Sequence, residues 1–156
     1  MAAVDAVERF VTSASGLGIE VAVRRCPEGT RTAVDAAAAV GCVVGQIVKS
    51  LVLMAGDRPV LVLCSGANRV DLVRVGAEFD GDVRMANADE VRAATGFAIG
   101  GAPPFGHPAP LPTLIDPDLL GYDEVWAAAG RPDSVFPLSP EALVEGSGAR
   151  TVEVAL

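Results

Sequence analysis

The stretch QIVKSLVLMAGDRPVLVLC, residues 46–64, decides the fold. It contains two apolar runs, residues 46–55 and 59–64, separated by the turn sequence Gly56-Asp57-Arg58. Apolar runs of this length joined by a short glycine-containing turn predict an antiparallel hairpin. Because both faces of each run are apolar, we expect the hairpin to lie at the centre of a sheet that is covered on both sides.

Helix-capping residues flank this hairpin on both sides. Thr32 with Asp35 three positions later is a capping box, and the alanine-rich segment after it predicts a helix closed by Gly41. Asn87 followed by Glu90 predicts a second capped helix. The other predicted elements are a helix over residues 4–11 that stops within 13–18, strands over 20–24, 113–115, 124–129 and 135–138, and a short helix from Ser139.

The predicted elements mix helices and strands without a regular strand–helix–strand alternation. This order predicts an α+β fold. We expect a single domain over residues 1–156, with a mixed, strongly curved, barrel-like sheet and flanking helices. A chain of 156 residues, 51% of them hydrophobic, is long enough to bury a core without disulfides or metal.

The composition excludes several classes of protein. No run approaches the ~20 apolar residues that span a bilayer, and Asp5 and Glu8 lie where a signal peptide would be basic and then apolar. The three cysteines match neither a CxxC motif nor a Cys/His zinc pattern. We therefore expect a cytoplasmic protein with reduced thiols, no metal, no cofactor and no membrane contact.

The net charge of −8 bears on nucleic-acid binding. Nucleic-acid binders usually carry a basic surface, and an acidic chain repels phosphate at long range. Arginines gather within residues 69–92, but aspartates and glutamates alternate with them. The charge therefore disfavours DNA and any extended nucleic-acid surface, and it is compatible with a site that grips only one end of a nucleic acid.

Lys49 is the first candidate site residue. It is the only lysine, against eleven arginines, and it lies inside the apolar run of residues 46–55. A charged lysine in such a strand is costly unless it meets an anion, a carboxylate or a cavity. Two interpretations stay open: a ligand-facing cation that suits a phosphate or a polarised carbonyl, or a lysine that reaches past the strand end or pairs with a buried aspartate.

The second candidate is the loop IGGAPPFG, residues 99–106. Adjacent Gly100 and Gly101 let backbone N–H groups point inward and approach a ligand closely, which can form a nest for an anion or oxyanion. Pro103 and Pro104 stiffen the loop. The same residues also fit a rigid connecting loop without a ligand.

Other reactive residues are weaker candidates. Cys64 and the only histidine, His107, could serve a hydrolase, although a buried structural cysteine and a surface histidine are commoner. Asp116, before a Pro-Asp pair, is first a turn former and second a site carboxylate. Gly130 lies in a turn sequence and could admit a ligand. No P-loop and no Gly-x-Ser-x-Gly motif occurs in the sequence.

Taken in series, these residues resemble the YbaK and prolyl-tRNA synthetase-associated editing domains, which are free-standing aminoacyl-tRNA deacylases. The similarity covers nearly the whole chain in the same order. It lies in the segments TAVDAA (32–37), IVKSL (47–51), GGAPPFG (100–106), Leu111-Pro112 with Asp116, and WAAAGR (126–131).

The resemblance implies hydrolysis of the ester that joins a wrong amino acid to a tRNA. The expected substrate is tRNA for proline, bound by its acceptor end, and prolyl-tRNA synthetase is a candidate partner. Water attacks with help from a ribose hydroxyl of the substrate, so no protein nucleophile is required. Lys49 would engage the terminal nucleotide or polar groups of the substrate, and Gly100 and Gly101 would position the carbonyl. The other substrate-binding residues would be Ser50, Ala102, Pro103, Pro104, Asp116 and Gly130.

The loop departs from that of the cysteine-removing members, which carry a small polar residue at the position of Pro103. We therefore expect a small amino acid such as alanine, with cysteine second. Ser50 should point to the strand face opposite Lys49 if the strand is regular, so it ranks below Lys49. The alternatives are a module that binds aminoacyl-tRNA or a small ligand without turnover, and an ester hydrolase that works through Cys64 or His107.

Overall fold

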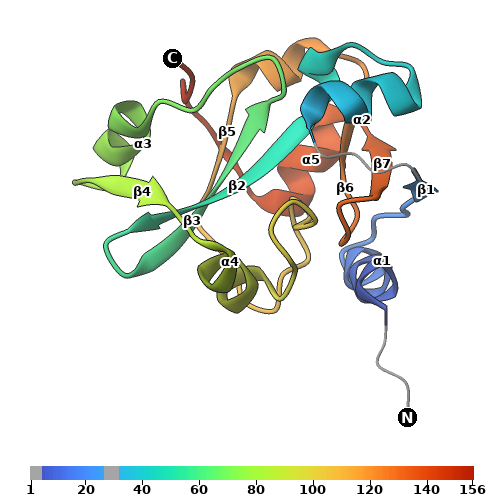
Figure 1. The fold of residues 1–156 in the computed structure, drawn as a ribbon, viewed down its shortest axis with the longest axis horizontal. Coiled ribbons are helices and arrows are strands. Elements are labelled where there is room, and N and C mark those ends of the chain that lie inside the picture. Colours follow the sequence, from blue (N-terminus) through green and yellow to red (C-terminus); the bar gives the residue numbers. More distant parts are fainter. Residues whose placement is uncertain (1–4, 27–31) are drawn as a thin grey trace.

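The computed structural model describes residues 5–26 and 32–156. Helices and strands follow one another irregularly along the chain (Figure 1), as expected for an α+β fold. The helices are α1 (Ala6–Gly16), α2 (Ala33–Val40), α3 (Leu72–Glu78), α4 (Ala88–Thr95) and α5 (Pro140–Ser147), with the 3-10 helices η1 (Val44–Gln46) and η2 (Pro117–Gly121). The strands are β1 (Arg24–Arg25), β2 (Val48–Ala55), β3 (Arg58–Ser65), β4 (Val83–Met85), β5 (Thr113–Ile115), β6 (Val125–Ala128), β7 (Ser134–Leu138) and β8 (Arg150–Thr151).

β2 and β3 form the hairpin predicted from the two apolar runs. Their antiparallel register is continuous from Val48 opposite Ser65 to Ala55 opposite Arg58. The hairpin lies inside a five-stranded sheet of order β4-β2-β3-β5-β8. β3 pairs with β5, and β5 with β8, in parallel, so this sheet is mixed, as predicted.

The remaining described strands form a second sheet, of order β1-β7-β6. Figure 1 shows β6 and β7 to the right of the long hairpin. An isolated parallel bridge between Ile47 and Trp126 connects the two sheets. The strands thus divide into two hydrogen-bonded sheets instead of the single sheet expected, and the strongly curved, barrel-like form stays a prediction.

The two faces of β2 pack into different parts of the core. Val48, Val52 and Met54 point to one face and belong to the larger cluster, together with three phenylalanines of α1, the 99–106 loop and β7. The ring centroids of these phenylalanines lie 5.0 to 6.0 Å apart. Leu53 points the other way, into a second cluster between the sheet and α3. The hairpin is therefore covered on both sides, as its composition predicts.

The predicted caps of α2 and α4 are confirmed. The Thr32 hydroxyl accepts a hydrogen bond from Asp35 N at 3.1 Å, and Gly41 closes α2 in the left-handed conformation with φ 77°. Asn87 and Glu90 form the reciprocal capping box of α4. These caps fix the first turns of the two helices whose residues border the site described below.

Some local predictions need correction. The strand expected over residues 20–24 is only the two-residue β1, because β7 pairs with Arg24 and Arg25 alone. The N-terminal helix continues to Gly16 because Ala14 is buried one turn after Phe10. The sequence patterns do not predict α3, β4 or η2, which are short and follow turn-forming residues.

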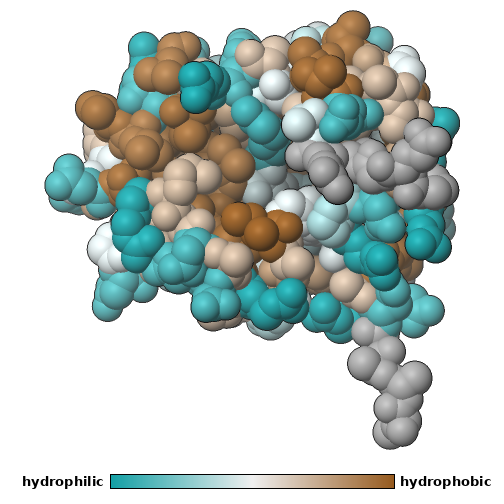
Figure 2. Space-filling view, in the orientation of Figure 1, coloured by the Kyte–Doolittle hydropathy of each residue, from teal (hydrophilic) through white to brown (hydrophobic). Residues whose placement is uncertain are grey.

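Apolar side chains gather on the surface at the end of the molecule that carries α3 and β4 (Figure 2). Val73 of α3 is 82% exposed, and Leu72 and Met85 are also exposed. No helix in the described ranges is long and apolar enough to cross a bilayer.

Candidate functional site

A pocket of about 350 Å³ opens between β2, β6, α2 and the 99–102 loop. Its walls are mostly small and apolar, which suits a small ligand rather than a flat stacked ring system. The lining residues are Thr32, Ala33, Ala36, Ile47, Val48, Lys49, Ser50, Leu51, Val52, Met85, Ala86, Val91, Ile99, Gly100, Ala102, Trp126, Ala127, Ala128, Pro132 and Val135.

The pocket lies at a gap along one edge of β2. At one end β4 follows, since the Val52 carbonyl accepts a hydrogen bond from Ala86 N at 3.0 Å. At the other end β6 meets the chain through the bridge between Ile47 and Trp126. Backbone groups of alternate residues in a strand point to the same edge, so the Ser50 N–H and C=O share the edge of the Val52 carbonyl. Within the described ranges no strand pairs with Ser50 on that edge, and these groups face the pocket.

The Ser50 side chain adds an unpartnered hydroxyl to the same place. It shares a face of β2 with Val48 and Val52, which also line the pocket. In the part of the chain that the structure describes, Ser50 Oγ is the one buried side-chain oxygen or nitrogen without a hydrogen-bond partner. A buried polar group left unpaired costs about 1–3 kcal/mol. A ligand with a matching polar group would complete its bonding.

Lys49 lies on the face of β2 opposite Ser50 and also contributes to the pocket wall. Its ammonium donates a hydrogen bond to the backbone carbonyl of Asn68, and it faces Cys64 across the hairpin. Lys49 is half-buried and is the only ionisable side chain among the lining residues of the described chain. The pocket thus meets both neighbouring residues because it opens at the edge of the strand.

The glycines of the 99–106 loop have different tasks. Gly100 adopts φ 85°, a conformation that favours glycine. Gly101 has no room for a side chain, since a Cβ there would lie 2.8 Å from Arg131 Cα. The Gly101 N–H donates to the Ala98 carbonyl at 2.9 Å, whereas the Gly100 and Ala102 N–H groups have no partner among the described residues. The donors free for a ligand are therefore Gly100 and Ala102, rather than the adjacent pair that the sequence suggests.

The prolines of this loop lie behind the pocket wall. Pro103 and Pro104 are buried, and Pro104 borders a second cavity of about 380 Å³. The Pro103 carbonyl lies 2.8 Å from His107 Nε2. Ala102, 4% exposed, is the neighbour that reaches the pocket. The structure thus brings Ala102 to the site and places the two prolines as its support.

Gly130 holds the same loop against the turn between β6 and β7. Its N–H donates to the Gly101 carbonyl at 3.0 Å. It adopts φ 108°, and a Cβ at this position would lie 2.7 Å from the Ala6 carbonyl oxygen. Gly130 is absent from the pocket lining, so its place is one of close packing next to the site.

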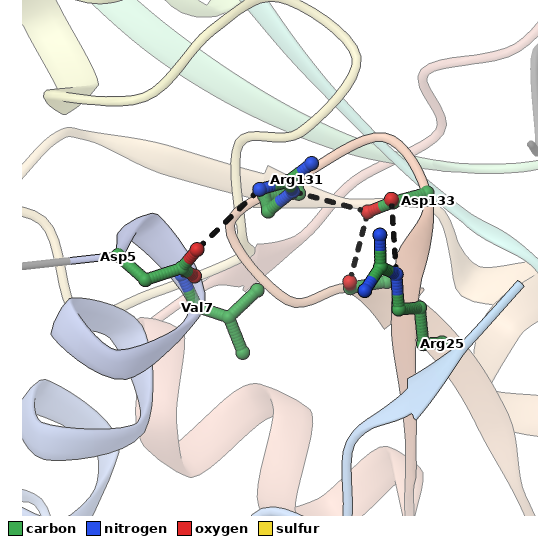
Figure 3. A network of polar contacts seen from close by, with 6 residues as sticks. Asp5, Val7, Arg25, Arg131 and Asp133 are labelled. Atoms are coloured by element: carbon green, nitrogen blue, oxygen red, sulfur yellow. Dashed lines mark hydrogen bonds and ion pairs between the residues drawn. The ribbon is translucent and has the colours of Figure 1, made fainter. Parts of the chain in front are cut away.

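Ion pairs fasten this turn to the N-terminal elements (Figure 3). Arg131 reaches Asp5 at 3.4 Å and Asp133 at 3.3 Å, and Arg25 of β1 reaches Asp133 at 3.5 Å. Although partial burial opposes the shift, the Ser134 hydroxyl and the two guanidinium groups hold the pKa of Asp133 below its ordinary value. The turn that carries Pro132 and Gly130 is therefore held from two sides.

Asp116 lies outside the pocket lining. It is 1% exposed, and its carboxylate accepts hydrogen bonds from Ser65 N at 3.1 Å, Asp118 N at 2.9 Å and Asn68 Nδ2 at 2.8 Å. It caps η2, which confirms the turn-forming role expected from its sequence context. Its carboxylate is occupied by protein donors rather than directed at a ligand.

Cys64 and His107 are poorly placed for catalysis in this pocket. Cys64 is fully buried, and burial raises the pKa of its thiol to about 11, so it stays protonated. Burial also lowers the pKa of His107, which borders the second cavity. No group of three or more His, Cys, Asp or Glu side chains that could hold a metal occurs among the described residues.

Several site residues lie beyond what the sequence reasoning singled out. Thr32, Ala36 and Trp126 line the pocket. They belong to the TAVDAA and WAAAGR segments that carry the family resemblance, which is the signal that could have found them. Asn68, the partner of Lys49, lies in a turn after β3 and has no comparable local signal.

The fold and the pocket define an α+β protein that binds a small ligand through one cation, one hydroxyl and several backbone groups. Comparison with protein families then gives the class of ligand. The chain belongs to the aminoacyl-tRNA editing domain family, whose sequence model matches residues 27–145. Editing is hydrolysis of the ester between an amino acid and tRNA, so the chain is an aminoacyl-tRNA deacylase, a carboxylic ester hydrolase. The expected relationship to YbaK-type editing domains is confirmed.

Individual relatives agree with this assignment. The protein YwhH of Bacillus subtilis is 32% identical over 117 residues, 74% of either chain. EbsC of Enterococcus faecalis, provisionally named a Cys-tRNA(Pro)/Cys-tRNA(Cys) deacylase, is 26% identical over 79% of this chain and 76% of its own. A crystal structure provisionally named a trans-editing enzyme for prolyl tRNA synthetase is 44% identical, with a TM-score of 0.93 over 99% of both chains. The proline–tRNA ligase of Lactobacillus gasseri is 37% identical over 56% of this chain, which spans 16% of the ligase.

Proposed function

We propose that the protein is a cytoplasmic trans-editing hydrolase that cleaves tRNA for proline carrying a small amino acid, such as alanine or cysteine. The observation that carries the proposal is the gap at the edge of β2, where Ser50 offers a hydroxyl and backbone groups to a small apolar pocket. The names of the 44%-identical structure and of EbsC support the choice of tRNA.

The size of the pocket supports a small amino acid. Its volume of about 350 Å³ lies near the lower end of the ~300–1,000 Å³ typical of small-molecule sites. Ala36, Ala102 and Ala127 form parts of the wall that a longer side chain or the ring of proline would contact. One methylene is worth only ~1–3 kcal/mol of selectivity, so we expect more than one small amino acid to be removed.

Each polar group of the site then has a task. The substrate ammonium binds the Ser50 carbonyl and hydroxyl at the gap. The ester carbonyl oxygen accepts hydrogen bonds from the Gly100 and Ala102 N–H groups, which are free in the described structure. Lys49 meets the terminal nucleotide at the pocket rim, where a compact ammonium suits a phosphate or hydroxyl. The two loop prolines and Gly130 support these groups from behind.

The chemistry needs no protein nucleophile. Water adds to the ester carbonyl carbon, and the electron pair moves to the carbonyl oxygen, where backbone N–H donors stabilise the charge. Collapse of this intermediate breaks the bond to the ribose oxygen, which leaves with the proton of the attacking water, relayed through the neighbouring ribose hydroxyl. The lining residues of the described chain include no carboxylate, imidazole or thiol, so substrate and solvent carry the proton.

The acidic charge limits the contact with tRNA. A net charge of −8 opposes a long track of phosphate contacts. We therefore propose that the protein grips only the acceptor end, and that prolyl-tRNA synthetase, if it binds as a partner, supplies the remaining contacts.

The experiment that tests the function is deacylation of alanyl- and cysteinyl-tRNA for proline by wild type, Lys49→Ala and Arg58→Ala. Arg58 is exposed in the hairpin turn and serves as the matched loss of one positive charge away from the site. We expect hydrolysis well above the spontaneous rate with wild type and Arg58→Ala, and its loss with Lys49→Ala at unchanged thermal stability.

A non-catalytic binding module is the second candidate, because the described pocket lining contains no general base. It would bind the same charged tRNA and protect the ester instead of cleaving it. Slower loss of the amino acid in the presence of folded wild-type protein would favour this function and contradict the first.

A further inference from the structure

Lys49 does not reach the pocket rim unsupported. Its ammonium donates to the backbone carbonyl of Asn68, in the turn that follows β3. A lysine side chain has four rotatable carbons, so a fixed acceptor is what holds its charge in one place. The position of the Lys49 ammonium therefore depends on what holds the Asn68 turn.

The Asn68 side chain ties this turn to η2. Its Nδ2 donates to Asp116 Oδ2 at 2.8 Å and to Asp118 Oδ2 at 2.7 Å. Both hydrogens of the amide are thus used, and both acceptors are carboxylates, which make stronger hydrogen bonds than neutral groups. The turn is clamped to a segment 48 or more positions further along the chain.

Asp116 is the fixed end of this chain of contacts. Besides Asn68 it accepts the N–H groups of Ser65 and Asp118, at 3.1 and 2.9 Å, and the Cys64 thiol lies 3.8 Å from it. It is 1% exposed. A buried carboxylate with this many donors has little freedom to move.

The charged and titratable groups that surround the Lys49 ammonium come from three elements. Cys64 comes from β3, and Asp116 and Asp118 come from η2, with the neutral Asn68 between them and the lysine. Lys49 and Asp116 both act on the Cys64 thiol, which lies between them. The two carboxylates supply the negative field that balances a half-buried ammonium.

From these contacts we propose that Asp116 and Asn68 are positioning residues: the buried carboxylate fixes the Asn68 turn, and the Asn68 carbonyl fixes the Lys49 ammonium at the pocket mouth. This inference rests on the proposed role of Lys49 in deacylation. It gives Asp116 a task through the protein in place of the substrate contact that its sequence context suggests.

The test uses Asn68→Ala, Lys49→Ala and the double variant, with Asp71→Ala as control. Asp71 caps α3 through hydrogen bonds to Val73 N and Arg74 N, away from the pocket, so its loss matches the structural cost of losing Asn68. In single-turnover deacylation we expect Asn68→Ala to lose about 10- to 100-fold, as for a misplaced catalytic group. Asp71→Ala should keep the wild-type rate. In the Lys49→Ala background the Asn68 substitution should cause no further loss.

A second readout is independent of activity. Because Lys49 is the only lysine, lysine labelled with carbon-13 at Cε gives one side-chain NMR signal. We expect this signal to move and sharpen in Asn68→Ala, as the released ammonium averages over rotamers, and to stay unchanged in Asp71→Ala. Should Asn68→Ala fail to fold, Asp118→Ala removes one of the two exposed-side acceptors and should shift the signal in the same direction by less.

Either of two results would overturn the proposal. One is an equal fold-loss from Asn68→Ala with and without Lys49, which would show that Asn68 acts independently of the lysine. The other is an unchanged Lys49 signal in folded Asn68→Ala or Asp118→Ala. A wild-type protein without deacylase activity would contradict the proposed function, but the NMR signal would still decide whether the clamp exists.

Discussion

Replacing Ser50 with alanine should make the protein more stable and less active. The Ser50 hydroxyl is buried without a partner in the described structure. Removing it relieves a penalty of about 1–3 kcal/mol, and the lost contacts of one oxygen are worth less than the ~0.8 kcal/mol of a methylene. We therefore expect a net gain of about 1 kcal/mol, which raises Tm by ~2–4 °C for a chain of this size.

Activity should move in the opposite direction. A hydrogen bond to a charged group such as the substrate ammonium is worth about 1.5–3 kcal/mol. Its loss corresponds to a fall of roughly 10- to 100-fold in kcat/KM for deacylation. The Ser50 backbone carbonyl remains in the variant, so some activity should persist.

The matched control is Ser65→Ala, in the other strand of the same hairpin. Ser65 is 1% exposed, but its hydroxyl donates to the Gly45 carbonyl at 2.8 Å. Its removal leaves that carbonyl unpaired and should destabilise the protein by about 1–3 kcal/mol. Urea unfolding of both variants measures the difference. Equal losses of stability would show that Ser50 is satisfied in the free protein and would refute the reasoning.

Other perturbations test the wall, the loop and a helix cap. Ala127→Leu fills the pocket from β6, so deacylation of cysteinyl-tRNA should fall more than that of alanyl-tRNA, measured by initial rates. Gly101→Ala places a Cβ 2.8 Å from Arg131 Cα and should cost about 1–3 kcal/mol in urea unfolding, more than Gly56→Ala's backbone strain alone. The hydrogen bond from Arg84 lowers the pKa of Glu90 from 4.5 to about 2. A lowered pKa stabilises the fold above pH 4.5 and loses its effect as the pH falls towards 2, so the Tm advantage of wild type over Glu90→Gln should shrink across that window.

Local sequence signals predict the elements whose ends they mark. The caps at Thr32 and Asn87 and the turn at Gly56-Asp57-Arg58 depend only on neighbouring residues, and the structure confirms all three. The division of the strands into two sheets depends on which distant segments pair. The bridge between Ile47 and Trp126 joins positions whose local sequences carry no pairing signal.

The site shows the same division. Lys49 and the 99–106 loop are visible in sequence because a lone lysine in an apolar strand and adjacent glycines are locally unusual. Asn68 and Asp116 come together only through the parallel pairing of β3 with β5, which brings η2 beside the turn after β3. A contact that depends on long-range topology leaves no mark in either local sequence.

The relation between Lys49 and Ser50 shows why sequence alone ranks them wrongly against each other. Strand alternation puts the two side chains on opposite faces, and a ligand bound on one face could reach only one of them. The structure instead opens the pocket at the edge of β2, in the gap between β6 and β4. At an edge both faces are accessible to one ligand, together with the backbone groups between them. A substrate seated there can meet the hydroxyl of one residue and the ammonium of the next, so adjacency in sequence becomes the means by which one strand serves both ends of an aminoacyl ester.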